Sequence, residues 1–121
     1  MTKSRDISEM KESQVAKAWC YFGGGTYNSV NPYIVRSFNV SSVTDASTST
    51  AGGQYTVNFE NNMESAGYVV ATSAGINGDG TVSSVWANTK SISSVDLFGL
   101  ANYGTNISFI DMGSINFVVF E

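Results

Sequence analysis

The chain has 121 residues, of which 42% are hydrophobic and 12% aromatic, and its formal net charge is −4. This length and composition support one domain with a real core and exclude a chain that is disordered throughout. Only two of the six basic residues, Arg36 and Lys90, follow Ala18, so the body of the chain is acidic and is not expected to bind nucleic acid.

The sequence lacks the residues that most catalytic and metal sites use. It contains one cysteine and no histidine, which excludes Ser-His-Asp and Cys-His catalysis and a tetrahedral zinc site within one chain. The carboxylates fall mostly at turns and polar strand positions, where solvated charges are common. We therefore expect neither an enzyme nor a cofactor.

Residues 1–15 are expected to form an arm ahead of the β domain. The start of the chain is its only stretch with ordinary helical composition, and Asp6 or Ser8 can cap a helix there, but its apolar side is weak. One interpretation is a frayed arm. The other, which we favour, is a helix or extended arm that docks on another chain or another copy. Because no apolar run is long enough for a signal peptide or a membrane span, we expect a soluble protein made in a cytoplasm, without membrane insertion.

The segment Ala18–Phe22 is predicted to be a strand that is apolar on both faces. Such a strand is expected between two layers or against a neighbouring subunit. Cys20 lies within it, cannot form an internal disulfide and is expected to be a buried thiol. The glycines Gly23–Gly25 predict a flexible turn, since no Lys-Ser/Thr pair follows them as in a phosphate-binding loop.

Two strands are predicted at Ile34–Val40 and Gln54–Glu60. Paired antiparallel, they would form a hairpin with Ser41–Gly53 as a long polar loop. A strand's period of two places alternate residues on one face. The residues expected to face the core are Ile34, Phe38, Val40, Tyr55, Val57 and Phe59.

Short strands also fill the second half of the chain. The last two are expected to form a hairpin about Met112–Gly113, and Trp86 is expected in the core, with a role in binding as the alternative. About eight short strands predict an all-β domain over 16–121, an antiparallel β-sandwich or a barrel-like fold. The strands expected in this half are Gly67–Ser73, Thr81–Asn88, Ser91–Phe98, Asn106–Asp111 and Ser114–Phe120.

Binding residues are expected at loops, where aromatic faces and short amides recognise sugars or proteins. Gly99–Thr105 is expected to be a loop, and Ala74–Gly80 is expected to be a turn. Asn77–Gly80 has oxygen ligands for Ca²⁺ but lacks the further carboxylates of a full site, so we expect a plain turn and no metal. The candidate receptor-binding residues are Tyr27, Asn77, Asp79, Asn102 and Tyr103.

Three stretches in order, Ala16–Trp19 (AKAW), Val35–Asp45 (VRSFNVSSVTD) and Gln54–Phe59 (QYTVNF), resemble a module that recurs in tailed-bacteriophage tail fibres, typically near their C-terminus. The match covers roughly residues 16–68. The resemblance implies a virion structural protein, homotrimeric as fibre tips usually are, with distal loops that contact the host. Its motif residues look structural and identify no receptor site. Met1 lies only a few residues before the module, so no long fibre shaft is expected.

The leading hypothesis is therefore a tail-fibre or fibre-tip module of a virion. Its expected partners are further copies of itself in a homotrimer, other virion proteins bound through the N-terminal arm, and a host-surface glycan or protein. One alternative is a capsid head decoration or assembly protein. Another is a stand-alone carbohydrate-binding module.

Overall fold

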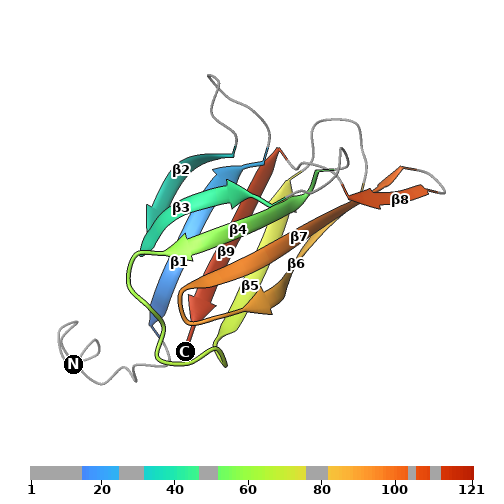
Figure 1. The fold of residues 1–121 in the computed structure, drawn as a ribbon. Helices are drawn as coiled ribbons and strands as arrows, with labels where there is room; N and C mark the ends of the chain where they lie inside the picture. Colours follow the sequence, from blue (N-terminus) through green and yellow to red (C-terminus); the bar gives the residue numbers. More distant parts are fainter. Residues whose placement is uncertain (1–14, 25–31, 47–51, 76–81, 104–105, 110–112) are drawn as a thin grey trace, which may run out of the picture.

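A computed structural model describes residues 15–24, 32–46, 52–75, 82–103, 106–109 and 113–121. This part of the chain is all-β and forms two antiparallel sheets that pack face to face (Figure 1). The predicted fold class, an antiparallel β-sandwich, is confirmed. The strands are β1 (Ala16–Gly23), β2 (Tyr33–Phe38), β3 (Val40–Asp45), β4 (Gln54–Phe59), β5 (Val69–Gly75), β6 (Val82–Lys90), β7 (Ser94–Tyr103), β8 (Asn106–Phe109) and β9 (Ser114–Phe120).

The chain alternates between the two sheets. The first sheet has the strand order β2-β1-β9-β5, and the second has the order β3-β4-β7-β6, with β8 paired to β7. Hairpins β1–β2 and β3–β4 lie in different sheets, β5 returns to the first, β6–β7–β8 belong to the second, and β9 inserts between β1 and β5. The two ends of the described chain are thus hydrogen-bonded neighbours inside one sheet.

The core lies between the sheets and follows the period of two. In β4 the strictly alternating Tyr55, Val57 and Phe59 are buried, as predicted. Tyr55 packs edge-to-face on Phe22 of β1, with ring centroids 5.4 Å apart, so aromatic contacts join the two layers. The other buried residues include Ala18, Cys20, Val40, Val43, Val95, Leu97, Ile115, Phe117 and Val119.

The predicted hairpin between 34–40 and 54–60 is wrong, because the chain changes sheet at Asn39. This residue has φ 55, in the left-handed region that interrupts a strand. The segment before it pairs with β1 in the first sheet, and the segment after it pairs with β4 in the second. Val40 is buried as expected, but Ile34 and Phe38 are exposed.

Three other expectations downstream are also wrong. Residues 106–109 pair with β7 rather than with the last strand, which lies in the other sheet. The expected loop at 99–105 is strand as far as Tyr103. Trp86 is only half-buried, because Val85 and Ala87 are the β6 residues that face the core.

Side-chain hydrogen bonds join the edge strands β5 and β6. Thr72 Oγ1 donates to the carbonyl oxygen of Val85 at 2.6 Å, and Lys90 Nζ donates to that of Tyr68 at 2.7 Å. These bonds hold the two sheets together along one edge of the sandwich. No helix that is long and apolar enough to cross a membrane occurs in the described ranges.

Candidate functional site

Two of the five predicted binding residues lie in the described part of the chain. Asn102 pairs with Val82 and Ile107, and Tyr103 pairs with Asn106, so both belong to the β7–β8 hairpin and not to a loop. That hairpin projects beyond the sandwich (Figure 1). Three further predicted residues, Tyr27, Asn77 and Asp79, lie outside the described residues.

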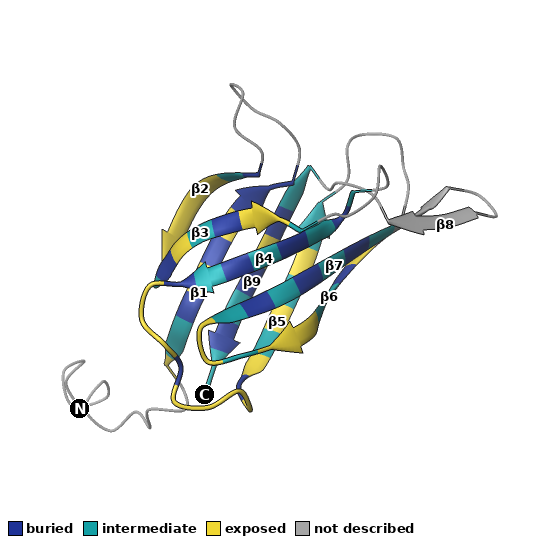
Figure 2. Ribbon diagram, in the orientation of Figure 1, coloured by how far each residue is buried: buried dark blue, intermediate teal, exposed yellow. Residues whose placement is uncertain are grey.

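The outer face of the first sheet carries a row of apolar side chains that crosses all four strands. In register, Phe38 of β2 lies beside Trp19 of β1, then Val118 of β9, then Ala71 of β5. Phe38 is 52% exposed and Trp19 38% exposed. We call this outer surface of β2, β1, β9 and β5 the apolar face. Figure 2 shows its edge strand β2 exposed along most of its length.

A second row extends the apolar face toward the start of β1. Here Phe120 of β9 lies between Ala16 and Val69, and Val69 is 63% exposed. Four strands about 4.8 Å apart and about six residues long give the whole outer face an area of roughly 400 Å². The apolar rows cover only part of it, because the neighbouring row on the same face holds Arg36, Tyr21, Asn116 and Ser73. The exposed apolar side chains gathered on this face make it a candidate contact surface.

The outer face of the second sheet differs from strand to strand: it carries the Trp86–Phe98 ring pair on β6 and β7, and polar side chains that bond to one another across β3, β4 and β7. Thr56 Oγ1 donates to Asp96 Oδ1 at 2.8 Å, and Asn58 Nδ2 donates to Ser42 Oγ at 3.0 Å. These groups are satisfied within the sheet and are compatible with solvent. The two faces of the sandwich therefore suit different surroundings.

The apolar face is uneven. Its β2–β1 half presents the large rings of Phe38, Trp19 and Tyr21. Its β5–β9 half carries Val69 and Phe120 at one end and, beyond them, a hollow of about 260 Å³ lined by Ala71, Ser73, Asn116 and Val118 among others. The face thus has a protruding half and a hollowed half.

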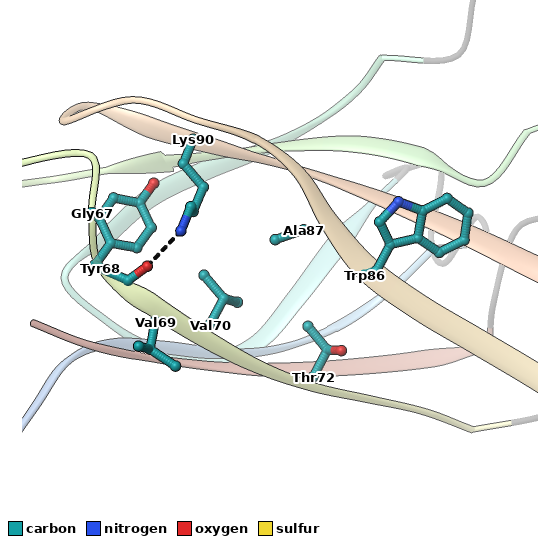
Figure 3. A pocket seen from close by; sticks show the side chains of 8 residues that line it. All are labelled: Gly67, Tyr68, Val69, Val70, Thr72, Trp86, Ala87 and Lys90. Carbon is teal, nitrogen blue, oxygen red and sulfur yellow. Dashed lines mark hydrogen bonds between the residues drawn. The ribbon is translucent and has the colours of Figure 1, made fainter.

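A separate cleft of about 410 Å³ opens at the edge of the sandwich between β5 and β6. Lys90 and Tyr68 lie at one end, followed by Val70, Thr72 and Ala87, while Trp86 borders the cleft with its indole turned to the outer side of β6 (Figure 3). The volume lies in the range of small-molecule sites. We call it the β5–β6 cleft.

Tyr68 forms the rigid end of the β5–β6 cleft. Its ring packs edge-to-face on Phe59, and its hydroxyl oxygen lies 2.9 Å from the carbonyl oxygen of Ser91 and 3.0 Å from that of Ser94. Burial raises the pKa of Tyr68 to about 12, with a smaller contribution from the negative charge of Asp96, while the bond to Ser91 opposes the shift. The hydroxyl is therefore protonated at neutral pH and serves as a structural donor.

The described residues hold no cluster of metal ligands and no reactive thiol. The single thiol, Cys20, is buried as predicted, and burial raises its pKa to about 12, so it is a poor nucleophile at neutral pH. Among the described ranges, no three side chains of Cys, Asp or Glu lie close enough together to hold a metal ion.

Comparison with known protein families, with curated proteins and with solved structures gives no match for this chain.

Sequence reasoning did not identify the two surfaces that the fold creates. The apolar residues on both faces of 18–22 were a signal for the apolar face, because they indicated contact on a second side. The sequence contained no pattern that predicts the β5–β6 cleft. The cleft lies between β5 of the first sheet and β6 of the second, and these two strands are not hydrogen-bonded neighbours.

Proposed function

We propose that the protein is a structural module of a bacteriophage virion, a tail-fibre or fibre-tip module that assembles as a homotrimer and recognises the host surface. The observation that carries the proposal is the apolar face, which in an isolated chain would leave Trp19, Phe38 and Val69 in water. The resemblance of residues 16–68 to tail-fibre modules supports the virion assignment.

The shape of the apolar face favours another copy of the chain as its partner. Its protruding rings and its hollow lie on opposite halves, so the rings of one copy can enter the hollow of the next. Such a head-to-tail contact closes into a ring when the rotation between copies allows it, and a trimer is the smallest ring beyond a dimer.

The flat apolar face is too small to form a stable interface by itself. A flat area of roughly 400 Å² is about half of the roughly 800 Å² that each partner buries in a stable interface. The outer edge of strand β2 adds contact surface beyond the flat face, because β2 ends the described sheet and its residues from Ile34 to Phe38 are all exposed. An unpaired, exposed edge of this kind is suited to contacts with a neighbouring chain.

Such an assembly leaves other surfaces for the host. With the apolar face directed toward the neighbouring copies, the outer face of the second sheet, with its polar β3–β4 side and its Trp86–Phe98 pair, remains in solvent. The projecting β7–β8 hairpin, which carries Asn102 and Tyr103, also belongs to the second sheet. Host recognition is therefore assigned to this sheet and its edges.

Sedimentation equilibrium of the purified chain tests self-association. We expect a trimer for the wild type and a folded monomer for Trp19→Glu, because a charge in the centre of the contact would have to be desolvated. Ile92→Glu is the matched control: Ile92 is also exposed, at 45%, but lies in the β6–β7 turn. A monomeric wild type, or equal dissociation of both variants, would overturn the proposal.

The fibre assignment needs a second experiment. A reconstruction of virions that contain the protein, with its copies located by their density, is expected to place them at the tail. Copies on the head lattice would instead assign the same oligomer to capsid decoration.

A further inference from the structure

Two aromatic rings lie together on the outer face of the second sheet. Trp86 of β6 and Phe98 of β7 are direct partners in the ladder and pack edge-to-face, with ring centroids 5.9 Å apart. Figure 3 shows the indole of Trp86 on the side of β6 that is turned away from Lys90. Both aromatic residues are half-buried, so the pair presents ring surface to solvent while each ring holds the other in place. We call Trp86 and Phe98 the ring pair.

Asp96 lies beside the ring pair on the same face of the sheet. It is two positions before Phe98 on β7, which corresponds to roughly 7 Å along the strand. Its Oδ1 accepts the hydroxyl of Thr56 at 2.8 Å, and no cation pairs with this carboxylate in the ranges that the structure describes. A carboxylate accepts several hydrogen bonds through its two oxygens. Beyond the bond from Thr56, Asp96 therefore has acceptor positions for hydroxyl groups that approach from the outer side.

An amide lies on the other side of the ring pair. Gln54 of β4 is the ladder partner of Phe98 opposite Trp86, and it is half-buried. Its side chain makes no hydrogen bond to another residue in the described part of the chain. The amide therefore offers both donors and acceptors to a ligand on this face. One row of the face thus carries an amide and two rings, and the next row carries a hydroxyl and a carboxylate.

These groups together define the class of ligand. A sugar ring has an apolar face that packs on an aromatic ring, and its hydroxyls donate to carboxylates and exchange hydrogen bonds with amides. We propose that the outer face of β4, β7 and β6 binds a neutral oligosaccharide of the host surface, with one sugar ring on the ring pair and its hydroxyls bonded to Asp96 and Gln54. This inference rests on the proposed role in host recognition.

The charge of this face favours neutral sugars over acidic ones. Of the basic residues that the structure describes, Lys17 and Arg36 belong to the first sheet, and Lys90 donates to the carbonyl oxygen of Tyr68 in the β5–β6 cleft. None of these cations can therefore neutralise an acidic ligand at the ring pair, where Asp96 would repel it. The formal net charge of −4 acts in the same direction.

Titration of the full chain by NMR with disaccharides tests the inference. The neutral probes are cellobiose, maltose, lactose, mannobiose and N,N′-diacetylchitobiose, and the acidic probes are digalacturonic acid and sialyllactose. For at least one neutral probe we expect saturable shifts with a Kd of about 1 mM, centred on the indole N–H of Trp86 and the backbone amides of Asp96 and Phe98. Neither acidic probe should bind more tightly than the best neutral one.

Two substitutions locate the site. Trp86→Ala removes one member of the ring pair and is expected to weaken binding about tenfold. Asp96→Asn keeps the volume and an acceptor for Thr56, so it tests the site without opening the fold. It is expected to weaken binding about fivefold, because hydrogen bonds to a charged acceptor are stronger than those to a neutral one.

Matched controls remove similar groups elsewhere. Ile92→Ala shortens an exposed apolar side chain in the β6–β7 turn, and Glu60→Gln removes an exposed carboxylate just after β4. Both control variants should bind like the wild type, since neither residue lies beside the ring pair.

The outcomes separate this inference from the proposed function. No saturable binding to any of the neutral probes, tightest binding of an acidic probe, or binding that Trp86→Ala and Asp96→Asn leave unchanged would overturn it. A trimeric, tail-located protein that fails these titrations would keep the proposed function and lose this site. A monomeric wild type that binds a neutral sugar through Trp86 and Asp96 would overturn the homotrimeric fibre module and leave the saccharide site standing, as part of a free carbohydrate-binding module.

Discussion

Cys20 and Tyr68 are two buried acids whose titration should make folding sensitive to alkaline pH. Burial raises the pKa of Cys20 from 9.0 to about 12 and that of Tyr68 from 10.0 to about 12. In this window the unfolded chain loses protons that the folded chain keeps, so the free energy of unfolding falls as pH rises above about 9. Below that pH both states are protonated at these groups, and the contribution is constant.

The alkaline loss of stability can be traced to the thiol by one substitution. Urea unfolding at pH 8 and at about pH 10 should show a smaller decrease for Cys20→Ala than for the wild type, since the variant has one fewer group to ionise. Tyr68→Phe provides a second, independent reduction. The assignment fails if both variants lose as much stability between the two pH values as the wild type.

Gly23 has no room for a side chain, because the Tyr33 ring lies against it. A Cβ at this position would overlap the Tyr33 ring at Cε1 and Cζ, because β1 and β2 pair Gly23 with Tyr33 directly. We expect Gly23→Ala to destabilise the fold by about 1–3 kcal/mol, as overpacking does. Gly67→Ala is the control, since its nearest atom is Ser65 Oγ at 3.5 Å, and should be within about 0.5 kcal/mol of the wild type.

A double variant distinguishes the clash from a general cost of alanine. In Gly23→Ala/Tyr33→Ala the ring is absent, so the two changes should be less costly together than the sum of their separate effects, measured by denaturant unfolding. Additive costs would show that the ring is not the obstacle.

At the scale of the elements, Asn39 joins three parts of the fold. Its Nδ2 donates to the carbonyl oxygens of Lys17 at 3.0 Å and Asn61 at 3.1 Å, and its Oδ1 accepts from the backbone amide of Asn61 at 2.7 Å. The residue thus ties the crossing from β2 to β3 both to the start of β1 and to the segment after β4.

Two substitutions separate the backbone role of Asn39 from its side-chain role. Asn39→Ala loses the hydrogen bonds and strains the left-handed backbone, with an expected cost of about 2–4 kcal/mol. Asn39→Gly loses the same bonds but tolerates φ 55, and about half of the cost should remain. Thermal and urea unfolding measure both, and equal costs would mean that the backbone conformation contributes nothing.

Asn39 also shows where sequence-based prediction of this fold ends. The alternation in 54–59 was enough to place β4 and its buried face, because a strand has a period of two. The same period runs through Phe38 and Val40, yet the turn between them sends the two residues to different sheets. A single residue with positive φ leaves no periodic pattern in the sequence. The two strands around Asn39 were therefore predicted, but the strands with which they pair were not.

The candidate site was less predictable than the fold for a related reason. The two-sided apolar pattern of 18–22 indicated a second contact, but the rows that form the apolar face come from strands distant in sequence. Trp86 was assigned to the core because it lies mid-strand on an apolar parity, but the residues of the other parity, Val85 and Ala87, are the ones that pack against the core.

At the scale of the whole molecule, the hollow on the apolar face gives a prediction that the exposed rings alone do not. If rings of one copy enter the hollow of the next, filling the hollow should block assembly while leaving the monomer intact. Ala71→Leu adds an isopropyl group beside Val118, in space that is empty in the isolated chain. The monomer should therefore keep its thermal stability, since the added atoms meet no packed neighbour.

We expect Ala71→Leu to weaken self-association about tenfold, which corresponds to about 1.4 kcal/mol, as measured by sedimentation equilibrium over a range of concentrations. Thr44→Leu is the control, because it adds a comparable apolar group to an exposed position on the outer face of the second sheet. Unchanged association in Ala71→Leu, combined with dissociation in Trp19→Glu, would show that the copies meet through the protruding rings alone. That result would favour a two-fold contact of ring against ring over a head-to-tail trimer, because only the head-to-tail arrangement needs the two halves of the face to differ.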